Sequence, residues 1–227
     1  MDAARVELMR ALGRVVRGLS TLFWALPLAI LVDVETARTD WLGPFGDAAV
    51  VPPLLAGAVL VYGLRQLRDF QKQERIWRRA LNRAEALAVV IAGLGPFLYW
   101  WHRFPSIRFY SFWVAALAFA FLLLLIEINR VLRRLCAMLP DEHLRQESRM
   151  FTTLNIALFL TSLAGLAAGL ALYQARDLPR PLAEIASGEN PRGLWLALFL
   201  NLLPLALTLA ILWRVKEVIY LSLFEAG

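Results

Sequence analysis

Long apolar runs are the feature that most limits what this chain can fold into. A helix needs roughly 20 apolar residues to cross a bilayer. The sequence is 59% hydrophobic with a mean hydropathy of +0.58, above the roughly 45–50% apolar content of soluble domains. We therefore predict an all-α integral membrane protein, a six-transmembrane-helix bundle. The predicted spans are residues 18–34, 50–64, 84–101, 109–128, 151–173 and 193–213.

Charge distribution sets the expected orientation. Basic residues gather in the connector 64–83, between the second and third runs, whereas Asp33, Glu35 and Asp40 follow the first run. Cytoplasmic loops of membrane proteins collect Lys and Arg. We therefore expect both termini in the cytoplasm of a bacterial-type inner (plasma) membrane. The same rule accounts for the net charge of +6 without a nucleic-acid-binding face.

The chain divides into three parts on this basis: a segment 1–17, a membrane domain 18–214 and a cytoplasmic tail 215–227. Segment 1–17 has the spacing of an amphipathic helix, which either lies on the membrane surface against anionic lipid or extends the first span. No A-x-A-like cleavage site follows the first run, so we expect an uncleaved anchor. The tail is apolar enough to lie on the membrane.

The connector 64–83 is also predicted to be ordered. No Gly or Pro occurs between residues 64 and 92, so we expect an amphipathic helix on the cytoplasmic surface. Its basic side chains are candidates for docking a soluble partner or contacting anionic lipid headgroups. These candidates are Arg65, Arg68, Lys72, Arg75, Arg78 and Arg79.

The six predicted spans pair into three helical hairpins. The sequences RALGR at 10–14 and RALNR at 79–83 are similar, and they precede the first and second hairpins. A weaker match beginning at Arg149 precedes the third, so the intervals are 69 and 70 residues. Even spacing of this kind is typical of an internal repeat. Since the matching residues are mostly arginines that also set topology, both explanations stay open.

Small and polar residues mark one face of the fifth span. They include a G-x-x-x-G motif, which lets two membrane helices approach closely. This face either lines a polar path or a subunit interface, or it packs inside the bundle. The residues are Thr152, Asn155, Ser162, Gly165 and Gly169.

The sixth span carries Asn201, Pro204 and Thr208 in its middle. A proline inside a helix removes one backbone hydrogen bond, and broken helices form mid-membrane sites in many transporters. Proline kinks also occur in bundles that transport nothing, so a site and a simple kink both fit.

Two carboxylates, Glu85 and Glu127, are predicted at the inner boundary of the third and fourth spans. Carboxylates at membrane depth are candidates for cation binding or proton relay. Arg83, Arg130 and Arg134 are close enough in sequence to form salt bridges with them instead.

No catalytic signature accompanies these features. The two histidines, His102 and His143, are predicted on opposite faces of the membrane, and Cys136 is the single cysteine. H-E-x-x-H, C-x-x-C, G-x-S-x-G and Walker patterns do not occur. We expect no catalytic residue, no cofactor and no metal site.

The pattern favours a non-enzymatic membrane protein, either a permease or pore-forming unit or a membrane-embedded subunit of a homo-oligomer or larger complex. An alternative is a structural or effector subunit whose basic cytoplasmic surface binds lipid or a soluble partner. A lipid-modifying enzyme comes third. A conduit requires a shared water-accessible cavity, and we expect Asn155, Ser162, Asn201 and Glu85 to converge on it.

Overall fold

The computed structural model describes residues 3–41, 43–68, 70, 74–104, 106–138, 142–174 and 191–225. Within these ranges the chain is helical apart from short turns, and no strand occurs. The all-α prediction is confirmed. The elements are α1 (Ala3–Arg38), η1 (Gly43–Val50), α2 (Val51–Leu67), α3 (Arg75–Leu94), α4 (Pro96–Arg103), α5 (Arg108–Met138), α6 (Glu142–Gln174) and α8 (Pro191–Glu225).

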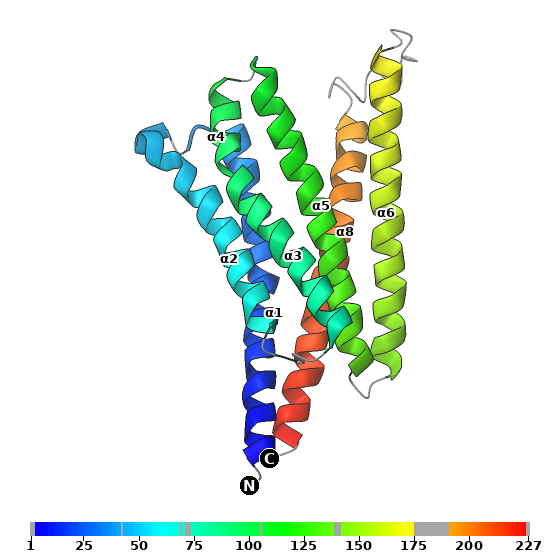
Figure 1. Ribbon diagram of the computed structural model, residues 1–227. Coiled ribbons are helices and arrows are strands. Elements are labelled where there is room, and N and C mark those ends of the chain that lie inside the picture. Colours follow the sequence, from blue (N-terminus) through cyan, green and yellow to red (C-terminus); the bar gives the residue numbers. More distant parts are fainter. Residues whose placement is uncertain are drawn as a thin grey trace.

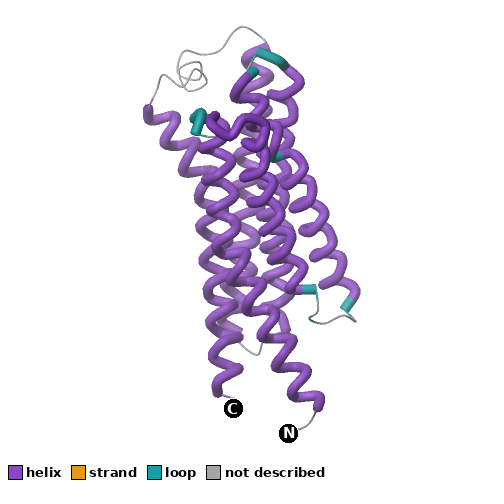
Figure 2. Tube along the Cα trace, turned by 90° about the vertical axis from the view of Figure 1, so that its left-hand side faces the viewer, coloured by secondary structure: helices purple, strands orange, loops and turns teal. Residues whose placement is uncertain are grey.

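The helices form one elongated bundle in which each neighbour in the chain is a neighbour in space (Figure 1). Successive long helices pack in pairs: α1 with α2, α2 with α3, α3 with α5, α5 with α6, and α6 with α8. Helix α8 also contacts α1 and α5. Both ends of the described chain lie at one end of the bundle (Figure 1 and Figure 2), together with the last turns of α2 and α5 and the first turns of α3 and α6. We call this the terminal end. The η1 helix and the α4–α5 turn lie at the other.

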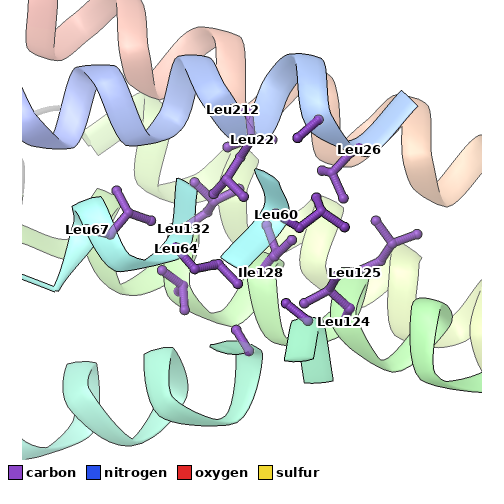
Figure 3. Packing of buried hydrophobic residues seen from close by; sticks show 14 of the residues in the cluster. Leu22, Leu26, Leu60, Leu64, Leu67, Leu124, Leu125, Ile128, Leu132 and Leu212 are labelled. Atoms are coloured by element: carbon purple, nitrogen blue, oxygen red, sulfur yellow. The ribbon is translucent and has the colours of Figure 1, made fainter. Parts of the chain in front are cut away.

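Leucine side chains dominate the core where α1, α2, α5 and α8 meet (Figure 3). Leu22, Leu60, Leu124 and Leu212 are at most 1% exposed. Gly57 allows α2 and α3 to approach, because a Cβ at this position would lie 2.5 Å from the Ala92 Cα. The small residue is therefore required by the backbone contact.

The outer surface is strongly apolar. On α1, Trp24, Leu28 and Leu31 are 70%, 50% and 61% exposed, and their spacing places them on one outward face. Soluble monomers rarely expose large contiguous apolar patches. Four helical stretches in the described part of the chain are long and apolar enough to cross a membrane: Met9–Arg38, Ala48–Leu67, Arg75–Arg103 and Arg108–Met138. These features fit a membrane protein.

The predicted continuous helix over the connector 64–83 is wrong. The connector is a chain reversal, because α2 ends at Leu67 and α3 begins at Arg75. Phe70 and Trp77 are 7% and 0% exposed, and their rings meet edge to face with centroids 6.1 Å apart. Burial of these two rings holds the turn against the bundle, in a stretch that has neither Gly nor Pro to mark it.

The two terminal segments also continue the long helices. Segment 3–17 is the first part of α1, without a break at residue 17. The tail residues 215–225 belong to α8, and Val215 and Ile219 are fully buried in the same cluster as Val15 and Leu19. The tail packs in the bundle because its apolar side chains find a partner in α1.

One proline of the predicted spans coincides with a helix break, whereas two others lie inside continuous helices. The third predicted span is divided at Gly95 into α3 and α4, with Pro96 at the start of α4. Pro27 and Pro204 instead lie inside the continuous helices α1 and α8.

Candidate functional site

A buried cluster of polar side chains joins α5, α6 and α8. Thr208 on α8 is its centre. The Thr208 Oγ1 accepts hydrogen bonds from Asn129 Nδ2 on α5 at 2.7 Å and from Asn155 Nδ2 on α6 at 3.2 Å. The three side chains are at most 1% exposed. We call Asn129, Asn155 and Thr208 the three-helix cluster.

Local helix chemistry fixes the direction of these bonds. The Thr208 hydroxyl donates to the Pro204 carbonyl at 2.7 Å, one turn earlier on α8. Its lone pairs then remain available to the two amide groups. Asn129 Nδ2 also donates to the Leu125 carbonyl at 2.8 Å. Pro204 therefore contributes a carbonyl that orients Thr208 within a continuous α8.

The cluster links three helices, and two of its oxygen atoms can still accept a hydrogen bond. The Oδ1 atoms of Asn129 and Asn155 are buried and have no hydrogen-bond partner in the described structure. Thr152, one turn before Asn155, donates to the Ser148 carbonyl of its own helix at 2.7 Å. The polar face of α6 thus divides between an interhelical contact and bonds within the helix.

For several predicted site residues on α6 and α8, the structure describes the backbone only. The backbones of Ser162, Gly165 and Gly169 belong to α6, and that of Asn201 belongs to α8. Their side-chain environments lie outside the described part of the chain. Asn129 was missed by sequence reasoning. Its only signal is an amide next to an apolar run, and it lies just past the predicted end of the fourth span at residue 128, beside Arg130.

Both predicted intramembrane carboxylates have arginine partners. Glu85 accepts a hydrogen bond from Arg65 Nε of α2 at 2.8 Å and lies 3.9 Å from Arg68. Glu127 pairs with Arg130, one turn later on α5. Glu85 thus connects α2 to α3, whereas Glu127 is neutralised within its own helix. The two carboxylates belong to separate ion pairs.

A second polar feature lies at the terminal end, beside the α2–α3 reversal. Arg68, Arg75, Arg78, Arg79 and Asn82 line a cavity of about 410 Å³, which we call the arginine cavity. Arg65 lies outside this lining and pairs with Glu85. Lys72, the remaining predicted docking residue, is outside the described residues. The described lining of this cavity gathers basic side chains and holds no carboxylate.

A smaller cavity of about 140 Å³ separates α6 from α8, next to the ion pair between Glu147 and Arg214 at 2.8 Å. Neither this cavity nor the arginine cavity is lined by Asn155 or Glu85. His102 lies far from both, where its Nδ1 is 3.2 Å from the Ala37 carbonyl.

The described residues hold no group of three or more His, Cys, Asp or Glu side chains arranged to bind a metal ion. The arrangement offers interhelical hydrogen bonding in its interior and anion attraction at its terminal end. No protein-family model, curated protein or solved structure matches this chain.

Proposed function

We propose that this chain is a non-enzymatic, membrane-embedded subunit that assembles with another membrane helix through the outer face of α6. In this proposal six helices span a bacterial-type inner membrane, and both termini are cytoplasmic. The partner is a second copy of the chain or another subunit of a complex.

The observation that carries the proposal is a ladder of small residues on α6. Thr153, Ala157 and Thr161 are exposed and spaced four residues apart. In sequence the same register continues to Gly165 and Gly169. Small residues repeated at this spacing let membrane helices pack closely.

The threonines of this ladder present a compact, largely apolar surface. Their hydroxyls donate to their own helix, from Thr153 to the Arg149 carbonyl at 3.0 Å and from Thr161 to the Ala157 carbonyl at 2.9 Å. The backbone carbonyls satisfy the hydroxyls, so the methyl groups can face a partner without leaving a polar group unpaired. In the described structure the main contacts of α6 are with α5 and α8, and the exposed ladder face remains open to a further helix.

The described polar residues support this subunit role over a permease or pore. A conduit predicts that Asn155 and Glu85 face one shared cavity. Asn155 is instead 1% exposed and bonded to Thr208, while Glu85 is paired with Arg65 between α2 and α3. Polar groups that hydrogen-bond or neutralise each other contribute to helix packing rather than to passage of a solute.

The test is the assembly state of the full chain in a mild detergent, measured by light scattering and by identification of co-purifying proteins. Ala157→Leu and Gly165→Leu place bulk on the ladder, so we expect loss of the assembly while the monomer still inserts. Ala58→Leu makes a matched change at an exposed position of α2 and should leave assembly intact. An unchanged assembly in both ladder variants, or a wild-type chain that is monomeric and unaccompanied, would overturn the proposal.

A further inference from the structure

The arginine cavity is built by one face of α3 and the end of α2. Arg75, Arg78, Arg79 and Asn82 follow the i, i+3, i+4, i+7 spacing that aligns side chains on one side of a helix. Arg68, directly after α2, completes the lining from the other side of the reversal. Two elements thus bring four guanidinium groups around one concave space.

Among the described residues, no carboxylate balances the charges in this cavity. The described lining holds no Asp or Glu, and in the same part of the chain no ion pair involves Arg75, Arg78 or Arg79. Glu85 reaches Arg68 only at 3.9 Å, while it bonds Arg65 at 2.8 Å. Four neighbouring positive charges repel one another, so an anion in the cavity lowers the electrostatic free energy.

The start of α3 adds to this positive potential. The first turn of the helix holds no acidic residue, although the positive end of the helix dipole favours one there. Glu74 precedes the helix, but its side chain makes no capping hydrogen bond, and its Oε2 has no hydrogen-bond partner. The arginines therefore line a cavity beside the positive end of the α3 dipole.

Size, chemistry and position agree on the kind of anion. The volume of about 410 Å³ lies within the roughly 300–1,000 Å³ of small-molecule sites. Guanidinium groups bind phosphate oxygens in pairs, and the Asn82 amide can donate to another. The cavity lies where the candidate spans Ala48–Leu67 and Arg75–Arg103 meet their connection. This is the level of phospholipid headgroups if these helices cross the bilayer.

We propose that the arginine cavity is a binding site for a phosphate-bearing anion. A phospholipid headgroup and a soluble phosphate supply the same chemical group, and the site is independent of the α6 interface proposed above. Basic residues collect on one side of any membrane protein, but that rule alone requires neither a common helix face nor a concave lining. The test therefore compares the loss of anion affinity on replacing these arginines with the loss on replacing other arginines at the terminal end of the bundle.

The experiment uses the full chain in detergent, with two probes. Native mass spectrometry measures retention of phosphatidic acid relative to phosphatidylcholine, and calorimetry measures binding of inorganic phosphate. The cavity variant is Arg75→Gln/Arg78→Gln. The control is Arg133→Gln/Arg149→Gln, which removes the same charge at exposed positions of α5 and α6 near the terminal end.

We expect the cavity variant to lose about 30-fold in affinity, because each arginine near a phosphate contributes roughly fivefold. The control should lose less than about threefold, in line with a purely long-range effect. Loss of phosphatidic acid retention identifies a lipid headgroup, and loss of inorganic phosphate binding identifies a soluble source. Equal losses in both variants, or binding of neither probe by the wild-type chain, would overturn the site.

A conservative variant protects the test against misfolding. Arg75→Lys/Arg78→Lys keeps the charge, so it should keep the fold, but lysine cannot bind a phosphate in the two-pronged way of arginine. We expect an intermediate affinity. If the lysine variant and the glutamine variant both bind the anion as tightly as the wild type, Arg75 and Arg78 do not contact the anion directly.

Discussion

Thr208→Val is the most informative perturbation of the bundle interior. Valine has nearly the shape of threonine but lacks the hydroxyl. The substitution removes the acceptor of two interhelical hydrogen bonds, from Asn129 at 2.7 Å and from Asn155 at 3.2 Å. Asn129 Nδ2 keeps its bond to the Leu125 carbonyl, whereas Asn155 Nδ2 keeps no other bond in the described structure. The damage should therefore centre on the α6–α8 contact.

The expected loss of stability follows from these bonds. Interhelical hydrogen bonds in membrane proteins contribute about 0.6 kcal/mol on average and at most about 1.7 kcal/mol. A buried donor left without a partner costs about 1–3 kcal/mol. We expect Thr208→Val to lower the free energy of unfolding by about 1–3 kcal/mol. Thr208→Ser keeps the hydroxyl and loses one methyl group, so it should lose less, about 1 kcal/mol.

Equilibrium unfolding in mixed micelles of increasing dodecyl sulfate content, followed by circular dichroism, measures both variants. Adding Asn155→Leu completes a double-mutant cycle, which isolates the pairwise term. The cluster predicts a coupling energy between Thr208 and Asn155 of about 0.6–1.7 kcal/mol. Strictly additive losses, or a Thr208→Val protein as stable as the wild type, would refute the cluster as a stabilising contact.

Five further substitutions test the packing of α2 and α3 by the same unfolding measurement. Gly57→Ala should lower the free energy of unfolding by about 1–3 kcal/mol through overpacking, because the new Cβ would lie 2.5 Å from the Ala92 Cα. Gly93→Ala is the control: its Cβ meets nothing within 4 Å, so it should be neutral or slightly stabilising. Trp77→Ala should cost about 3–5 kcal/mol as a cavity in a fully buried site, and Trp77→Phe should recover most of that loss. Glu85→Gln breaks a pair whose arginine is 64% exposed, so we expect less than about 1 kcal/mol, shrinking with added salt; a salt-independent loss would contradict this assignment.

Sequence pattern predicts the helical class because bilayer-length apolar runs admit few alternatives. The Gly95–Pro96 break also has a local cause, because a missing N–H and a flexible residue coincide there. The reversal between α2 and α3 could not be predicted in this way. It depends on Phe70 and Trp77 entering the core, which is a tertiary contact, and the local sequence lacks the residues that normally mark a turn.

The composition of the polar cluster shows a second limit. Asn155 and Thr208 stand out in their spans, but periodicity does not give the rotation of one helix relative to another. Their contact through Thr208 Oγ1 was therefore not predictable, and Asn129 was hidden by its charged neighbour. The docking arginines were identified by charge alone. Their concave arrangement follows from the α3 register and the closeness of Arg68, which only the folded reversal provides.

The central claim is a dry bundle interior with the α2–α3 reversal on the cytoplasmic side. Cysteine labelling in intact cells and inverted vesicles tests both parts, using Asn155→Cys and Arg75→Cys separately in a Cys136→Ala background with a membrane-impermeant maleimide. The account predicts that residue 155 stays unlabelled from either side and that residue 75 reacts only from the cytoplasmic side. Labelling of residue 155, or reaction of residue 75 from outside the cell, would contradict it.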